Sequence, residues 1–313
     1  MKVIFMGTPQ FAVVSLKKLL VEKFNIVAVV TAPDKEKGRG LKIQSSPVKL
    51  EALRHNIPVL QPSKLKDEKF CHQLRDYAVD LIVVVAFRIL PEAVFELPEK
   101  GTINLHGSLL PKYRGAAPIN WAIINGEKET GLTTFFIKKQ VDTGNIIDRK
   151  KIPIDDNMTA GELHDIMATV GAELLVDTCR SIETGSVKTK IQDDNQVTLA
   201  PKIFRKDCII NFNQPAKKVH DFIRGLSPYP SAHTYLDIKM IKFYLSKVFD
   251  VNDYSCFPPG SIVQINKNEL ILKCNPGSIS IGEVQLEGKK RMTVSDFLRG
   301  YPIAQGIKFG NLN

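Results

Sequence analysis

An apolar run without polar interruption, Leu81 to Phe87, limits the possible folds of this chain more than any other stretch of its sequence. The run has the length of a strand and is far shorter than the roughly 20 apolar residues of a membrane span. A strand that is apolar on both faces lies in a sheet covered on both faces. Val3 to Met6 and Ile26 to Val30 have the same character, with a helical pattern from Phe11 to Leu20 between them. This alternation predicts an α/β fold with a doubly wound, Rossmann-like, mostly parallel sheet.

In the second half of the chain the alternation of strand and helix patterns ends. One long amphipathic helix is expected from Gly161 to Thr184, and a weakly periodic connector covers residues 188–204. Because 313 residues exceed what one core usually supports, we predict two domains, residues 1–204 and residues 205–313. The later part contains short apolar runs separated by Asn, Gly and Pro: Ser261–Ile265, Leu270–Cys274, Ser278–Ile281 and Glu283–Leu286. Their spacing predicts a small antiparallel barrel or sheet.

Composition indicates a globular protein, and the charge bears on the kind of partner it binds. With 43% hydrophobic and 24% charged residues, the chain has the composition of a globular protein and not of a disordered one. The net charge is +10, and residues 205–313 contain 15 basic against 9 acidic residues. Such an excess of basic residues favours a polyanionic partner. It does not distinguish a nucleic acid from an acidic membrane, and it also fits a charge that serves only solubility.

Several other classes are not expected. The chain reaches Gly7 and Pro9 after a short apolar run, too soon for the hydrophobic region of a signal peptide, so we expect a cytoplasmic protein without a membrane segment. The five cysteines form no CxxC pair and the histidines lack the spacing of metal ligands, so neither disulfides nor a metal site is expected. The segment from Met6 to Pro9 lacks the P-loop lysine and the GxGxxG run, which argues against a nucleotide cofactor.

The residues best suited to chemistry follow a predicted strand. Asn104 and His106 are two residues apart and share one face of that strand, and ligands of such sheets bind beyond the carboxyl ends of the strands. An amide and an imidazole side by side can both donate to the oxyanion of an attacked carbonyl. Asp142, in a loop that ends in Gly144, is the leading candidate to orient the imidazole. By residue types alone, a structural Asn–His pair and an ordinary Asp-Thr-Gly turn account for the same pattern.

A basic, glycine-punctuated segment, Lys35 to Lys42, follows the second predicted strand. It suits a solvated surface loop, and it equally suits a phosphate-seeking arm in which Arg39 supplies a bidentate fork. Ser108 lacks the Gly-x-Ser-x-Gly context of a hydrolase nucleophile, so we interpret it as a backbone or ligand contact.

Taken together, these motifs resemble the methionyl-tRNA formyltransferase family over essentially the whole chain. The segments that carry the resemblance are Phe5–Pro9, Asn104–Pro111, Tyr113–Pro118, Asp142–Gly144, Ala200–Ile203, Ile223–Leu226 and Gly288–Met292. The resemblance implies transfer of a formyl group from 10-formyltetrahydrofolate to the α-amino group of methionine on initiator tRNA, without a metal. It assigns Asn104 and His106 to the tetrahedral oxyanion, and Asp142 to the orientation of His106 and to proton movement.

The resemblance also implies binding residues. Those assigned to the folate pocket are Ser108, Leu109, Leu110 and Pro111, with Phe87, Leu90 and Pro91 from a second loop. Those assigned to the acceptor-stem side of the tRNA are Arg39, Lys37, Lys42 and Lys206. The basic C-terminal domain, an OB-like barrel in this family, would hold the tRNA backbone, and we expect a monomer. The sequence departs from the family at Phe87-Arg88-Ile89, which lacks a glycine often found there.

Two other functions are weighed against this one. Relatives that formylate small amines share the catalytic motif, but they do not call for a basic domain of about 100 residues. A tRNA-binding protein without catalysis is the second alternative, and the intact Asn104, His106 and Asp142 speak against it.

Overall fold

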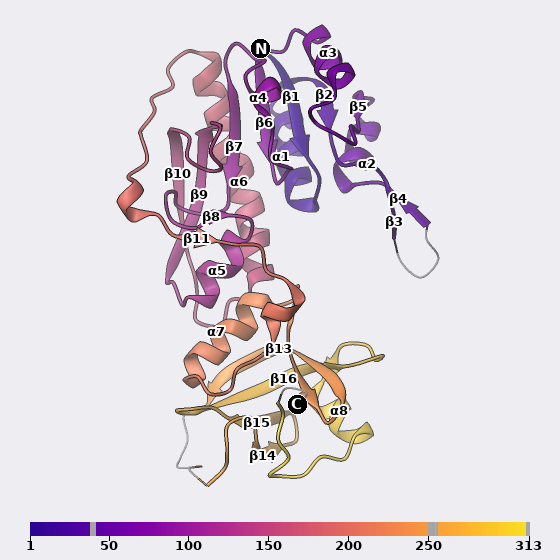
Figure 1. Ribbon diagram of the computed structural model, residues 1–313, viewed down its shortest axis with the longest axis vertical. Helices are drawn as coiled ribbons and strands as arrows, with labels where there is room; N and C mark the ends of the chain where they lie inside the picture. The colour runs from indigo at the N-terminus through magenta and orange to yellow at the C-terminus, as the bar shows by residue number, and fades with distance from the viewer. Residues whose placement is uncertain (38–41, 250–253, 255, 311–313) are drawn as a thin grey trace. The chain divides into compact units, whose positions relative to one another are not determined.

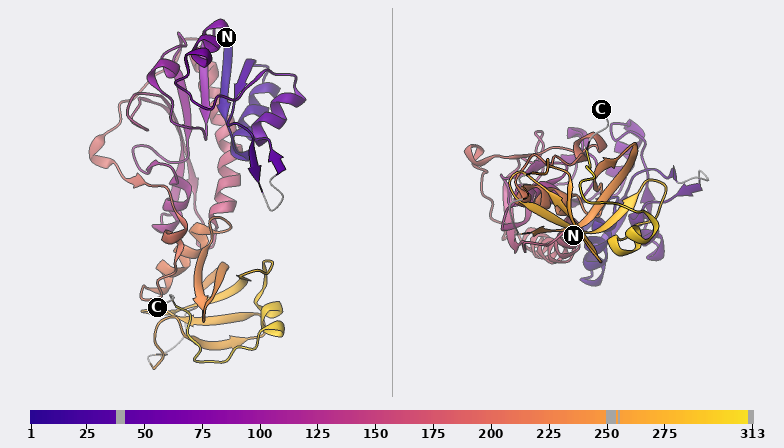
Figure 2. Two further views of the ribbon diagram at one scale, coloured as in Figure 1. Left: turned by 45° about the vertical axis from the view of Figure 1, so that its right-hand side comes forward. Right: turned by 90° about the horizontal axis from the view of Figure 1, so that it is seen from below.

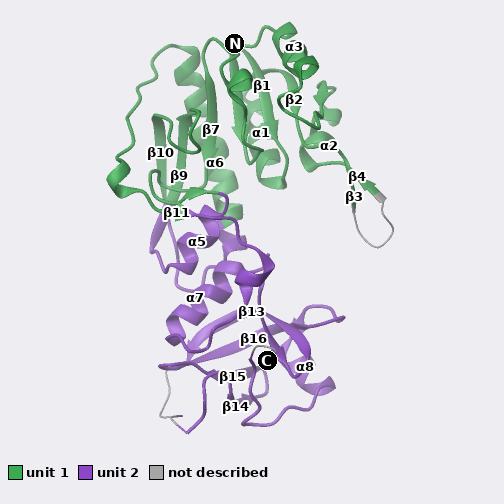
Figure 3. Ribbon diagram, viewed as in Figure 1, with its two compact units in different colours: residues 1–115, 131–152, 164–199 green, residues 116–130, 153–163, 200–313 purple. Residues whose placement is uncertain are grey.

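The structure is a computed structural model that describes residues 1–37, 42–249, 254 and 256–310 (Figure 1). It contains two compact units (Figure 3). Residues 1–115, 131–152 and 164–199 form the first unit, and residues 116–130, 153–163 and 200–313 form the second. The division that the sequence predicts, between residues 204 and 205, stays a prediction.

The first unit is built on a seven-stranded sheet with the order β10-β9-β7-β6-β1-β2-β5 (Figure 1). The strands are β1 Lys2–Gly7, β2 Asn25–Val30, β5 Val59–Leu60, β6 Leu81–Val85, β7 Thr102–His106, β9 Glu129–Phe136 and β10 Ile146–Pro153. The run from β5 through β2, β1 and β6 to β7 is parallel, and β9 joins β7 in the antiparallel direction. The mostly parallel sheet predicted from the sequence is therefore confirmed.

Helices cover the sheet because its strands are apolar on both faces. They are α1 Gln10–Val21, α2 Pro47–Arg54, α3 Glu68–Asp76, α4 Glu92–Phe95 and α6 Ala160–Glu183 (Figures 1 and 2). All five residues of β6 are buried, which is the burial that its unbroken apolar run predicts. The long helix predicted from Gly161 to Thr184 is α6, and its Gly171 lies against Leu105 of β7 and Leu132 of β9.

The two ends of the basic segment after β2 are short strands. β3 Lys35–Lys37 pairs with β4 Lys42–Gln44 in the antiparallel direction, so the segment is the base of a hairpin. Two short polar runs separated by a stretch with two glycines are typical of a hairpin, and the expectation of a loop missed this pairing. Residues 38–41, which include Arg39, lie outside the described residues.

The second unit contains a six-stranded antiparallel sheet with the order β12-β13-β16-β15-β14 and with β17 beside β16. The strands are β12 Ala232–Leu236, β13 Lys239–Phe249, β14 Ile262–Asn266, β15 Glu269–Lys273, β16 Ser278–Leu286 and β17 Met292–Thr293. Residues 308–310 bridge both edges, through Gly310 to Tyr235 of β12 and through Lys308 to Ser261 before β14. This strap joins the two edges of the sheet, as in a barrel, and the predicted antiparallel C-terminal sheet is confirmed.

One detail of the predicted C-terminal strands is wrong. The runs Ser278–Ile281 and Glu283–Leu286 form the single strand β16, because Gly282 continues the strand instead of ending it. The pairing register of β13 with β16 shifts around Leu245, and a Cβ on Gly282 would lie 3.2 Å from Leu245 Cδ2. The glycine thus accommodates a bulge beside a bulky neighbour.

The remaining elements join and support these sheets. They are β8 Arg114–Gly115, which pairs with β11 Leu199–Ala200, the helices α5 Pro118–Ile124, α7 Ala216–Leu226 and α8 Val294–Gly300, and the short 3₁₀ turns Asp194–Gln196 and Arg205–Cys208. In the second unit, α7 packs on α5 and on β13. The core of this unit includes Phe243 and Phe309, whose rings meet edge to face at 5.6 Å.

Candidate active site

β7 positions the two residues that the sequence singles out first. Asn104 and His106 lie on this strand, which runs between β6 and β9, and His106 is its last residue. The His106 side chain is buried, and Asn104 is half-buried. Within the described residues the Asn104 amide forms no hydrogen bond to the protein, so its two N–H donors are available to a ligand.

The hydrogen bonds of His106 define the state of its ring. Nε2 lies 2.9 Å from the carbonyl oxygen of Tyr113, and a carbonyl can only accept, so Nε2 carries a proton and donates. Nδ1 lies 3.8 Å from Asp142 Oδ2. In the neutral ring Nδ1 is therefore the basic nitrogen, and a carboxylate faces it.

Asp142 reaches His106 from the loop between β9 and β10. Its backbone is left-handed, with φ of 56°, and its Oδ2 accepts a hydrogen bond of 2.9 Å from the Gly115 amide. Gly144 follows because no other residue fits: a Cβ there would lie 1.5 Å from the carbonyl oxygen of Phe136. The Asp-Thr-Gly sequence is thus a turn whose geometry aims a carboxylate at the end of β7.

Gln192 is a part of this site that the sequence analysis missed. Its buried side chain donates from Nε2 to the carbonyl oxygens of Asp142 and Gly144, at 2.8 Å each. Its Oε1 accepts from Nε and Nη2 of Arg114, at 3.1 and 2.8 Å. A single glutamine in a polar connector carries no local signal, and only its contacts reveal it.

The segment from Ser108 to Pro111, predicted to contact folate, is held by its own polar atoms. Ser108 Oγ donates to the carbonyl oxygen of Lys112, and Thr133 Oγ1 donates to that of Ser108 at 2.7 Å. Leu110 is fully buried in a small core cluster with Phe135 and Ile146. The side chains of Ser108 and Leu110 are thus turned to the protein, and the Leu110 amide and the carbonyl oxygens of Ser108, Leu109 and Leu110 are hydrogen-bonded within it, so both the side chains and the main chain fix this segment. Its role stays a prediction.

The second predicted folate segment, Phe87 to Pro91, follows the carboxyl end of β6. Phe87 is half-buried, Leu90 is buried, and Pro91 directly precedes α4. Arg88 donates to the carbonyl oxygens of Pro62 and Ser63 at 2.8 and 3.1 Å, and its guanidinium lies 5.2 Å from the centroid of the Phe87 ring. Burial lowers the pKa of Arg88. Arg88 therefore ties this segment to the one after β5.

The residues predicted to contact tRNA belong to both units. Lys206 is exposed in the turn Arg205–Cys208 of the second unit. Lys37 and Lys42 pair with each other in the hairpin of β3 and β4, although the positions of their side chains lie outside what the structure describes. Arg39 lies outside the described residues.

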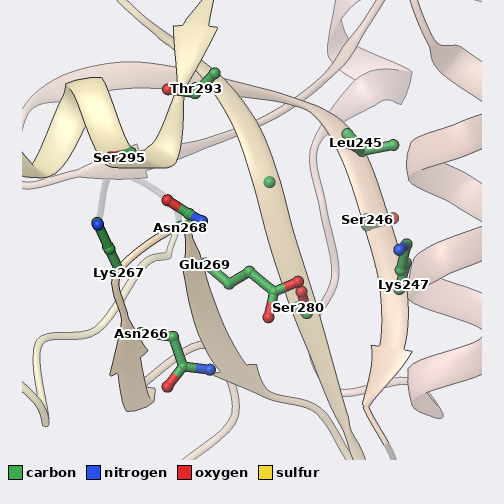
Figure 4. Close-up of a pocket in the computed structure, with 11 residues that line it drawn as sticks. Leu245, Ser246, Lys247, Asn266, Lys267, Asn268, Glu269, Ser280, Thr293 and Ser295 are labelled. Carbon is green, nitrogen blue, oxygen red and sulfur yellow. The ribbon is translucent and has the colours of Figure 1, made fainter.

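Two open surface pockets lie elsewhere, and Asn104, His106 and Asp142 line neither of them. One, of about 660 Å³, lies on the C-terminal sheet and is lined mostly by polar side chains of β13, the β14–β15 turn and the start of α8 (Figure 4). The other, of about 580 Å³, lies in the first unit between α1, β2 and the end of α2. In the part of the chain that the structure describes, no three His, Cys, Asp or Glu residues gather as metal ligands would. None of the described helices has the length and apolar character needed to cross a bilayer.

Comparison with known families adds independent findings. The profile described as "Formyl transferase" matches residues 1–179, and that described as "Formyl transferase, C-terminal domain" matches residues 202–302.

Curated relatives match over nearly the full chain. A protein of Azobacteroides pseudotrichonymphae is 50% identical, with 98% of each chain covered. One of Bacteroides fragilis is 46% identical over 98% of this chain and 97% of its own, and one of Acetivibrio thermocellus is 44% identical over 99% and 100%. All three are named methionyl-tRNA formyltransferase.

Solved structures share the fold. The N-formyltransferase of Helicobacter canadensis, in complex with folinic acid and dTDP-3-aminofucose, has a TM-score of 0.63 at 21% identity and covers 90% of this chain and 98% of its own. HypX of Aquifex aeolicus, in complex with tetrahydrofolic acid, has a TM-score of 0.67 at 15% identity and covers 100% of this chain and 51% of its own. At such identities the likeness concerns the fold alone.

Proposed function

Because this chain belongs to the methionyl-tRNA formyltransferase family, we propose that it transfers the formyl group of 10-formyltetrahydrofolate to the α-amino group of methionyl initiator tRNA. The product is the N-formylmethionyl-tRNA used to start translation. The observation that carries the proposal is the pairing of His106 Nδ1 with Asp142 Oδ2 at 3.8 Å, next to the Asn104 amide. His106 thus supplies a proton carrier, and the Asn104 amide supplies an oxyanion donor, at one strand end.

The chemistry follows from the hydrogen bonds of the site. The uncharged amine attacks the formyl carbon, so a C–N bond forms and the carbonyl oxygen becomes an oxyanion, to which Asn104 donates from its free amide. His106 takes the proton released by the amine on Nδ1, because Nε2 already donates to Tyr113. Asp142 stabilises the resulting imidazolium, directly or through one water, and the proton passes to the departing folate nitrogen as the old C–N bond breaks.

Formyl transfer of this family uses a folate-type donor, and we assign the donor site to the two segments that flank the strand ends. We assign Ser108, Leu109, Leu110 and Pro111, with Phe87, Leu90 and Pro91, to this site, and the half-buried side chains of Leu109 and Phe87 are apolar groups that a ligand can reach. The HypX and Helicobacter canadensis structures, solved with tetrahydrofolic acid and folinic acid, support a folate as the donor.

For the acceptor, we propose that the tRNA backbone binds to the basic C-terminal domain, residues 205–313, including Lys206, and that its acceptor stem meets Lys37, Arg39 and Lys42. The excess of 15 basic over 9 acidic residues in this domain supports a polyanionic partner. We further propose that the protein acts as a cytoplasmic monomer.

A formylation assay tests the function. Purified protein and 10-formyltetrahydrofolate are combined with methionyl initiator tRNA, methionyl elongator tRNA, glycinamide ribonucleotide or an amino-sugar nucleotide. We expect product on the initiator tRNA alone. Formylation of a small amine instead would assign the enzyme to another acceptor, and no transfer to any acceptor would favour the binding protein without catalysis.

A further inference from the structure

We propose that Gln192 is a positioning residue for formyl transfer, which holds the Asp142 loop so that the carboxylate faces His106. The inference rests on the proposed function, because it gives Gln192 a part in that same reaction. Gln192 is 50 positions from Asp142 and lies in the connector after α6, yet its side chain is only 7% exposed.

The Gln192 amide has one allowed orientation. Nε2 uses both of its N–H groups, on the carbonyl oxygens of Asp142 and Gly144, and Oε1 accepts twice from the Arg114 guanidinium. Rotating the amide by half a turn would set its oxygen against two carbonyl oxygens and its N–H groups against a guanidinium. The partners therefore fix both ends of the side chain.

The Asp142 loop needs such a restraint. A non-glycine residue at φ of 56° is strained, so its backbone persists only where the surroundings determine it. The Gly115 amide holds the carboxylate at 2.9 Å, and Gln192 holds the main chain on both sides of Thr143. Gly115 thus holds the side chain of Asp142 by a hydrogen bond, and Gln192 holds its backbone.

The segment from Tyr113 to Gly115 forms hydrogen bonds with all three of these side chains, those of His106, Asp142 and Gln192. The Tyr113 carbonyl accepts from His106, and the Gly115 amide donates to Asp142. Arg114, between them, donates to Gln192 with a side chain that is 12% exposed. Three consecutive residues therefore hold the histidine, the aspartate and the glutamine that supports the aspartate. Without the Gln192 amide, the Asp142 loop is released while the hydrogen bond between His106 and Tyr113 remains.

The substitution Gln192→Glu keeps the hydrogen bonds with Arg114 and removes those to Asp142 and Gly144. The new carboxylate keeps acceptors for Arg114 but has no N–H group for Asp142 and Gly144, and it faces their carbonyl oxygens. Displacement of a catalytic group by about 1 Å can cost a factor of 10² in rate, so we expect kcat to fall at least about tenfold, with KM for tRNA changed less than about twofold. Gln196→Glu is the matched control, because it makes the same change at an exposed residue of the same connector.

A double-mutant comparison distinguishes positioning from general stability. If Gln192 acts through Asp142, Gln192→Glu costs less than about twofold further in the Asp142→Ala background, measured in single turnovers with excess enzyme. If the two reductions in rate multiply in full, the proposal is wrong. Gln192→Met, which is neutral and of similar length, replaces Gln192→Glu if thermal melting shows that the latter does not fold.

A second measurement does not depend on the acceptor. In protein labelled with ¹⁵N-histidine, the His106 signals are assigned by their disappearance in His106→Gln. We expect Gln192→Glu to move the Nδ1 signal of His106 and Gln196→Glu to leave it in place. An unmoved signal, or a kcat within twofold of wild type, would overturn the proposal for Gln192. A wild-type enzyme that formylates no acceptor would overturn the proposed function, and the His106 signal would still decide the role of Gln192.

Discussion

The end of β7 in the first unit and the basic surface of the second unit use charge in opposite ways. At β7, His106, Asp142 and Gln192 are largely buried, and each is held by two or three partner residues. In the second unit Lys206, Lys289 and Lys290 are exposed. Buried groups act as a unit, so removal of one disables the rest, whereas exposed cations contribute small and nearly additive amounts. Four predictions test this contrast.

Replacing His106 by alanine should reduce kcat by a factor of about 10² to 10⁴, because the proton carrier next to Asp142 is removed. The exposed His72 provides the matched control, and His72→Ala should retain wild-type turnover. Both variants are compared by initial rates on methionyl initiator tRNA and by thermal melting. A folded His106→Ala variant with turnover within threefold of wild type would remove His106 from the mechanism.

Arg224→Met tests whether the second unit, too, depends on a buried charge. Arg224 is 3% exposed, donates from Nε to Asp221 at 2.7 Å, and donates to the carbonyl oxygens of Asp155 and Met158. Breaking a buried pair typically costs about 3 to 5 kcal/mol of folding free energy, and we expect the lower end because Lys217 still contacts Asp221.

The control for Arg224→Met is Arg299→Met, which breaks an exposed pair with Asp296 and should cost at most about 1 kcal/mol. Urea unfolding measures the free energy of unfolding of the two variants and of the wild type. Equal destabilisation of the two variants would mean that burial does not set the energy of ion pairs in this unit.

The stability of the second unit should fall as the pH drops below about 6.5, the ordinary histidine value. Burial lowers the pKa of His220, whose ring bonds Ser246 and the carbonyl oxygen of Asp156. In this pH range His220 is protonated in the unfolded chain but not in the folded one. The free energy of unfolding therefore decreases as the pH falls from 6.5 towards the lower pKa of His220 in the folded state. His220→Gln should flatten the dependence of Tm on pH in this range, with His72→Gln as the control. A slope unchanged in His220→Gln would contradict the assignment.

The smallest effects are expected on the basic surface. Lys206→Ala, Lys289→Ala and Lys290→Ala should each weaken tRNA binding a few-fold and lower the slope of log Kd against log salt by about 1 for each phosphate that is no longer neutralised. Lys66→Ala, an exposed lysine of the first unit, serves as the control. Titrations over a range of KCl concentrations measure the slope. If all three variants keep the wild-type slope, these cations do not bind the tRNA backbone.

How far the sequence predicts this structure depends on the range of the interaction. The unbroken apolar run at Leu81 predicts a buried strand, and the helical period after Gly161 predicts α6, because both patterns follow from burial along a few turns of chain. The continuity of β16 through Gly282 was not predicted, since it depends on Leu245 of a different strand. The closure of the C-terminal sheet by residues 308–310 likewise depends on partners about 50 to 75 positions away.

The sequence alone determined the α/β class, the antiparallel character of the C-terminal sheet, the family, and the candidates Asn104, His106 and Asp142. It did so because hydrophobic period and motif spacing are local properties of the chain. The folded structure is needed to see that His106 donates from Nε2 to Tyr113 and turns Nδ1 to Asp142, and that Gln192 donates to the carbonyl oxygens of Asp142 and Gly144. These contacts join residues that are distant in the sequence, and a hydrogen bond is defined by where folding brings its donor and acceptor.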